Sequence, residues 1–261
     1  MFSKTFALAY AGIAYVLALA YIAYIAYIVG FLADFGVPKG INDGVAGALW
    51  PSVAINLGLI WLFGLHHSAT ARRWFKARWT RTVPPSLERA TYLYMTALAT
   101  GALLILWQPI PITVWQVENV GACWAIWAAY LGVWGMMFLA TFHFGHFGFF
   151  GLAQAWAKAT DRGPGETAFC ARWLYGVVRH PISLGWMLTP WLTPHMTVGQ
   201  FVFAIGATVY VLIATVFEEA DLAADLGDVY RRYRTEVPAF VPGLRRLRQV
   251  FHIPAVFADD E

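Results

Sequence analysis

Ionisable residues gather at both ends of one apolar stretch near the carboxyl end of the chain. Arg179 and His180 lie just before this stretch, and Glu218 and Glu219 lie just after it. If residues 182–217 form a helical hairpin, both ends meet at one membrane face although His180 and Glu218 are 38 residues apart. Arginine and histidine would then offer cations for a carboxylate, and the glutamates would accept from an amino group or from ribose hydroxyls. Snorkelling of charged side chains at the membrane interface is the alternative.

Histidines at the ends of two other apolar segments form a second group of candidates. His66 and His67 end the second segment, and His146 follows the fourth. Imidazole is the side chain best poised near neutral pH, so each of the three is a candidate general base. The alternative role is hydrogen bonding to backbone groups at the ends of neighbouring helices.

The composition places these residues in a membrane protein. The chain has 261 residues, of which 59% are hydrophobic and only 13% are charged, about half the charged fraction of soluble domains. Residues 5–33, 44–71 and 180–217 contain no Asp, Glu, Lys or Arg. A soluble or disordered chain would not carry so much apolar sequence, and two cysteines exclude a disulfide scaffold.

We predict an all-α polytopic membrane protein with about six membrane passes and additional cytoplasmic helices. A helix needs about 20 apolar residues to cross the hydrocarbon layer. The fifth predicted pass is shorter than this and forms a helical hairpin with the sixth. The predicted passes cover residues 6–32, 45–66, 90–107, 120–142, 182–193 and 197–217. The whole chain, residues 1–261, then forms a single domain.

The distribution of basic residues predicts the orientation. Residues 72–89 carry six Lys and Arg against one acid, and placing this loop in the cytoplasm leaves only Lys39 of 18 basic residues outside. We therefore expect an integral protein of a bacterial inner (cytoplasmic) membrane with both termini cytoplasmic and with basic side chains at lipid headgroups. Nucleic acid is excluded as a partner, because its binders present one continuous basic face.

Several fixed spacings follow the predicted hairpin. They are Glu218-Glu219-x-Asp221-Leu222 and Gly227-x-x-Tyr230-x-x-Tyr233-x-x-x-Val237-Pro238-x-Phe240-x-Pro242. Together with Arg179-His180-Pro181, this pattern resembles the carboxyl-terminal half of the isoprenylcysteine carboxyl methyltransferase superfamily. The resemblance implies an integral membrane methyltransferase that uses S-adenosylmethionine, releases S-adenosylhomocysteine, and binds its cofactor within residues 179–242. The cofactor contacts that it implies are Arg179, His180, Pro181, Glu218, Glu219 and Tyr230. Ser183 stands where the superfamily often has a tyrosine, so a hydroxyl of shorter reach replaces a phenol there.

Three further motifs narrow the resemblance to the bacterial methanethiol S-methyltransferase branch, which is related to the NnrU-like proteins. The motifs that carry it are Gly64-Leu65-His66-His67-Ser68, His146-Phe147-Gly148-Phe149-Phe150-Gly151-Leu152-x-Gln154 and Thr193-Pro194-x-Met196-Thr197-x-Gly199. This branch implies methylation of methanethiol, a small volatile thiol, to dimethyl sulfide without a metal ion. A base must then remove the thiol proton, and the candidates are His66, His67 and His146.

Two other functions are compatible with the same residues. An enzyme of the same fold would methylate another thiol or the carboxylate of an isoprenylcysteine. A protein of a different class, a haem-binding membrane electron carrier, would use histidines such as His66 and His146 as axial ligands. A Soret absorption band in the purified protein would indicate the haem carrier, and its absence would favour the enzymes.

Overall fold

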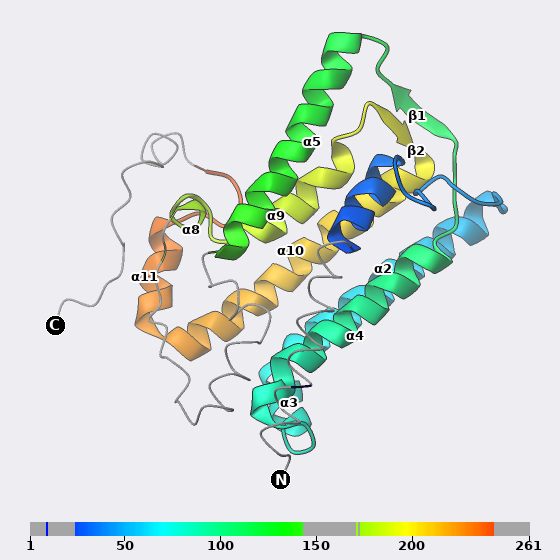
Figure 1. Ribbon diagram of the computed structural model, residues 1–261. Helices are drawn as coiled ribbons and strands as arrows, with labels where there is room; N and C mark the ends of the chain where they lie inside the picture. Colours follow the sequence, from blue (N-terminus) through cyan, green and yellow to red (C-terminus); the bar gives the residue numbers. More distant parts are fainter. Residues whose placement is uncertain (1–8, 10–23, 143–170, 172, 243–261) are drawn as a thin grey trace.

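The computed structural model describes residues 9, 24–142, 171 and 173–242, and this part of the chain is mostly helical (Figure 1). Among the described residues, three helices are long and apolar enough to cross a membrane: α2 (Leu49–Ala71), α5 (Val120–Thr141) and α10 (Val198–Leu226). Shorter apolar helices cover Tyr24–Ala33 and Thr91–Leu106, the latter within α4 (Pro85–Leu106). The chain is thus a helical integral membrane protein, while the predicted count of six passes is not confirmed.

The predicted hairpin is present, with a short first arm and a long second arm. The first arm is α9 (Pro181–Leu188) followed by the 3-10 helix η2 (Thr189–Trp191). Pro181 occupies the first position of α9, where a missing N–H costs nothing. The second arm, α10, packs against α9 and continues nine residues beyond the predicted end at residue 217.

The prediction of an all-α protein is wrong in one detail. Strand β1 (Thr113–Gln116) pairs antiparallel with β2 (His195–Thr197), which lies in the turn of the hairpin. Thr113 faces Thr197 and Gln116 faces His195 in this two-stranded sheet. Prolines at positions 109 and 111 oppose a helix before β1. The extended chain therefore satisfies its backbone groups on the hairpin turn.

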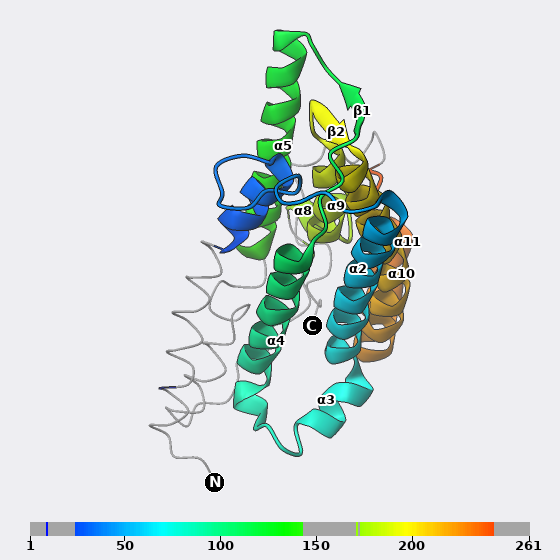
Figure 2. The same cartoon turned by 90° about the vertical axis from the view of Figure 1, so that its right-hand side faces the viewer.

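Helix α2 packs against both α10 and α4 and lies between them (Figure 2). Glycines allow α2 and α10 to approach closely: a side chain at Gly64 would meet the Tyr210 ring, and one at Gly206 would meet Ile60. The Ser68 and Tyr210 hydroxyls lie 3.1 Å apart at the same contact. Small residues are the usual way for helices to pack tightly in a membrane.

Replacing Gly64 with alanine is expected to destabilise the α2–α10 contact. A Cβ at this position would lie 2.5 Å from the Tyr210 ring, and such overpacking costs about 1–3 kcal/mol. Gly58→Ala is the matched control, because Gly58 lies on the same helix and a Cβ there would have no neighbour within 4 Å. Melting temperatures in detergent should fall for Gly64→Ala and stay the same or rise for Gly58→Ala. Equal melting temperatures for the two variants would contradict this packing.

Lys39 lies at the end of the bundle away from the basic loop. Its Nζ donates to the carbonyl oxygens of Ile105 and Trp107, so it caps the carboxyl end of α4. Burial lowers the pKa of Lys39, although Asp43 partly opposes this effect. Nearby, the fully buried Asn56 amide exchanges two hydrogen bonds with the backbone of Gln108. Lys39 and Asn56 are thus paired in a region where water is scarce.

The other end of the bundle carries short polar helices. The chain breaks at Arg72 between α2 and α3 (Arg73–Trp79), and α3 links α2 to α4 (Figure 2). Gly227, with a φ of +60°, separates α10 from α11 (Asp228–Glu236). This left-handed conformation favours glycine and lets α11 fold back toward α8 (Leu174–Val177), where the Tyr233 hydroxyl donates to the Tyr175 carbonyl at 2.6 Å.

Candidate active site

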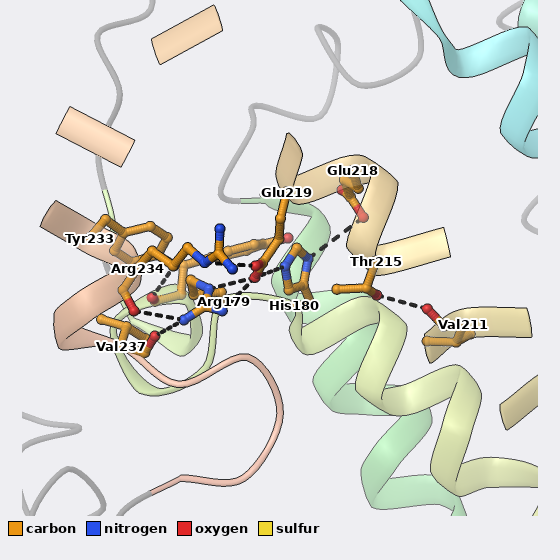
Figure 3. Close-up of polar contacts among 10 residues, drawn as sticks. Arg179, His180, Val211, Thr215, Glu218, Glu219, Tyr233, Arg234 and Val237 are labelled. Carbon is orange, nitrogen blue, oxygen red and sulfur yellow. Dashed lines mark hydrogen bonds and ion pairs between the residues drawn. The ribbon is translucent and has the colours of Figure 1, made fainter. Parts of the chain in front are cut away.

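A cluster of charged side chains joins the start of α9, the end of α10 and α11 (Figure 3). Its centre is Glu219, whose Oε1 accepts from Arg179 Nε at 2.8 Å and lies 3.1 Å from His180 Nε2. Arg234 Nε approaches the other oxygen, Oε2, at 3.2 Å. We call Arg179, His180, Glu218, Glu219 and Arg234 the charged cluster. The sequence pattern predicted that the hairpin would bring the first four together, and the structure confirms it.

Arg179 also ties the cluster to the carboxyl end of α11. Its Nη1 donates to the carbonyl oxygens of Arg234 and Val237. The backbone amides of Arg179 and His180 donate to the carbonyl oxygens of Pro238 and Ala239. The segment before α9 is therefore held in place by both side-chain and backbone hydrogen bonds that it donates to carbonyls in the last turn of α11 and just after it.

His180 lies between the two glutamates. Its Nε2 faces Glu219, and its Nδ1 lies 3.6 Å from Glu218 Oε2. A carboxylate only accepts, so a hydrogen bond to Glu219 requires the proton on Nε2. The Phe240 ring packs against the imidazole with its centroid 5.9 Å away. The site thus combines fixed charges with an aromatic surface.

The remaining predicted cofactor residues border the same cluster. Pro181 is fully buried at the start of α9, and Tyr230 packs against Tyr233 within α11 with ring centroids 5.8 Å apart. Burial, reinforced by the Glu219 charge, raises the pKa of Tyr230 to about 12, and Arg179 opposes the shift. The Tyr230 phenol therefore stays protonated at neutral pH.

His67 faces α4. Its ring nitrogens lie 3.1 Å from the Tyr92 hydroxyl, and its ring stacks on Phe63 at 5.5 Å. Phe63 in turn contacts Tyr210 of α10 with ring centroids 6.2 Å apart. His67 thus belongs to an aromatic layer between α2, α4 and α10.

His66 projects from a different side of α2. At about 100° per residue, it lies about 160° around the helix from Gly64 and Ser68, the residues that contact α10. Its Nδ1 is buried and has no hydrogen-bond partner among the described residues. The third candidate base, His146, lies outside the described residues.

Two partners of the predicted residues were not expected from the sequence: Arg234 pairs with Glu219, and Tyr92 contacts His67. A further ion pair joins Arg72 Nη1 to Asp221 Oδ2 at 3.0 Å, and it is not aligned as a hydrogen bond. The sequence does contain a signal for Arg234: it follows Tyr230 by four residues, so the two side chains lie on the same face of a helix. Among the described residues, no group of three His, Cys, Asp or Glu side chains is placed to hold a metal ion.

These features define a polytopic helical membrane protein with a partly buried charged site at one end of its final hairpin. A Pseudomonas protein named methanethiol S-methyltransferase is 43% identical over 89% of this chain and 90% of its own length. A Mycobacterium tuberculosis protein of the same name is 40% identical over 86% of this chain and 92% of its own length. The chain therefore belongs to the methanethiol S-methyltransferase family.

Another relative is more distant. The Danio rerio protein named Nurim is 26% identical over 68% of this chain and 67% of its own length. No family model and no solved structure matches the chain. The relatives confirm the resemblance found in the sequence motifs and the prediction of a methyltransferase, and they support this enzyme class over the haem carrier.

Proposed function

We propose that this protein transfers a methyl group from S-adenosylmethionine to methanethiol, which yields dimethyl sulfide and S-adenosylhomocysteine. The observation that carries the proposal is the set of relatives named methanethiol S-methyltransferase, which are 35–43% identical over most of the chain. In the reaction, the thiolate sulfur forms a bond to the methyl carbon while the bond from that carbon to the donor sulfur breaks. The thiol proton must leave first, because the thiol itself is a poor nucleophile.

The cofactor end of the site is the charged cluster with Pro181 and Tyr230. When bound, S-adenosylmethionine supplies an electrophilic methyl group on a sulfonium sulfur. Its amino, carboxylate and hydroxyl groups need charged and polar partners, which Glu218, His180 and Arg234 offer. Phe240 beside His180 offers an aromatic face, to which cations are attracted. The side chains present therefore fit such a donor.

The proton acceptor that we favour is His67, with His66 and His146 as the other candidates. Tyr92 holds the His67 ring at 3.1 Å, and orientation by a third group is typical of a general base. Phe63 links His67 to Tyr210 on α10, the helix that carries Glu218 and Glu219. The direction of His66, away from α10, argues against it.

The proposed location is a bacterial inner membrane with the charged cluster and both termini on the cytoplasmic side. Support comes from Lys39, which caps α4 at one end of the bundle, while the basic helix α3 lies at the other end. A reporter that is active only in the periplasm should be inactive when it is fused after Glu261. Activity of that reporter would contradict the orientation.

A panel of acceptors tests the substrate. Purified protein in detergent is incubated with S-adenosylmethionine and one of three acceptors: methanethiol, a larger alkyl thiol, or an S-farnesyl cysteine derivative. The rate of methyl transfer to each acceptor is measured. Methanethiol should give the highest kcat/KM, and the protein should show no Soret absorbance. Preferred methylation of the farnesyl compound would replace the proposed acceptor, and a Soret band would favour the haem carrier.

A further inference from the structure

Four contacts occupy the Glu219 carboxylate. Arg179 donates Nε and Nη2 to Oε1, His180 Nε2 lies 3.1 Å from the same oxygen, and Arg234 Nε lies 3.2 Å from Oε2. Oε1 thus faces three N–H groups, which is more than its two lone pairs can accept, while Oε2 faces the Arg234 guanidinium. Its side chain is also only 10% exposed. Glu219 is therefore held by groups of the protein itself and offers little open surface to a ligand.

Arg179 is occupied in the same way. A guanidinium has about five N–H donors, and Arg179 directs four hydrogen bonds to Glu219 and to the carbonyls of Arg234 and Val237. Its side chain is 9% exposed. The cation and the anion at the centre of the cluster thus satisfy each other and the end of α11.

Glu218, the next residue along the chain, is in the opposite situation. Its side chain is 49% exposed, and its contact to His180 Nδ1 spans 3.6 Å, which is longer than a hydrogen bond. No hydrogen bond to its carboxylate is present within the described part of the chain. This carboxylate remains able to accept from a ligand.

We infer that the two adjacent glutamates have different roles. Glu219 and Arg179 form a positioning pair that holds His180 and the end of α11, and Glu218 is the carboxylate that accepts N–H or O–H groups of the methyl donor. This inference rests on the proposed function, because it requires the donor to bind at the charged cluster. Glu218 thus contacts the ligand, whereas Glu219 positions neighbouring groups of the protein.

Two isosteric substitutions in the full-length protein test the division. Glu218→Gln should keep the wild-type melting temperature and weaken binding of S-adenosylhomocysteine about 10- to 100-fold, the effect of losing one charge-assisted hydrogen bond. Glu219→Gln should lower the melting temperature of the ligand-free protein by about 5–10 °C, because it removes the negative charge that faces two arginines. Both quantities are measured in detergent, the affinity by calorimetry well below the melting temperatures.

Ligand affinity and KM, measured on folded protein, distinguish a positioning role of Glu219 from a merely structural one. At a temperature where it is fully folded, Glu219→Gln should still bind S-adenosylhomocysteine more weakly while its KM for methanethiol stays unchanged. If Glu219→Gln does not fold, Arg234→Gln replaces it, since it removes one contact from Glu219 at a 56% exposed position and should lower the melting temperature less.

Two results would overturn the inference. One is a normal melting temperature with weak ligand binding in Glu219→Gln, and the other is wild-type affinity in Glu218→Gln. Failure of the wild-type protein to bind S-adenosylhomocysteine is a different result, because it refutes the proposed function and the inference with it.

Discussion

Replacing His67 with alanine is expected to lower turnover about 10²- to 10⁴-fold, the range for loss of a general base. Methylation of a thiol releases a proton, and the site needs an acceptor that titrates near neutral pH. His67 is held by Tyr92 within the aromatic layer that reaches α10. The affinity for S-adenosylhomocysteine should not change, because the charged cluster remains intact.

The pH dependence and a neighbouring histidine provide the controls for this prediction. The residual rate of His67→Ala should rise with pH, since more thiolate then arrives preformed from solution. His66→Ala changes the same residue type at nearly the same depth of α2, and it should lower turnover much less. Initial rates of dimethyl sulfide release give both comparisons. Near-normal turnover of His67→Ala at neutral pH would show that this histidine is not the base.

The second large effect is expected for Arg179→Ala. This substitution leaves the Glu219 carboxylate buried without its main partner and removes two caps from the end of α11. Breaking a buried ion pair costs about 3–5 kcal/mol. We therefore expect a large fall in the free energy of unfolding and loss of cofactor binding. Arg179→Lys should not restore either one, because an ammonium cannot reproduce the planar set of donors.

Arg232→Ala is the matched control for this result. Arg232 is exposed on α11, two residues before Arg234, and its replacement removes the same charge from the same region. Such surface changes usually alter the free energy of unfolding by less than about 0.5 kcal/mol. Equal melting temperatures for Arg179→Ala and Arg232→Ala would contradict the central position of Arg179.

The hairpin and its cluster were predictable because opposite charges lie at the two ends of an apolar segment that is too long for a single membrane pass. Arg179, His180, Glu218 and Glu219 could meet only if residues 182–217 turned back, and the structure has this turn. The sequence pattern does not predict which of these charged side chains pair with one another inside the protein. Whether Glu219 or its neighbour Glu218 points into the protein depends on the rotation of α10, and hydrophobicity alone does not fix this rotation.

Contacts between helices that are far apart in the sequence could not be predicted either. The adjacent residues His66 and His67 are equivalent as candidates until the α2–α4 packing turns His67 toward Tyr92. The β1–β2 pairing was missed because its strands are short and each depends on the other for its hydrogen bonds. Arg72 carries an orientation signal in the sequence, yet in the structure it also pairs with Asp221 across helices.

Transfer of a labelled methyl group tests the central claim most directly. Purified protein is incubated with methanethiol and S-adenosylmethionine that carries a trideuterated methyl group, and the headspace gas is analysed by mass spectrometry. We predict dimethyl sulfide with one labelled and one unlabelled methyl group, formed in step with S-adenosylhomocysteine and lost in the Arg179→Ala variant. Dimethyl sulfide without the label, or none above the protein-free control, would contradict the proposed methyl transfer.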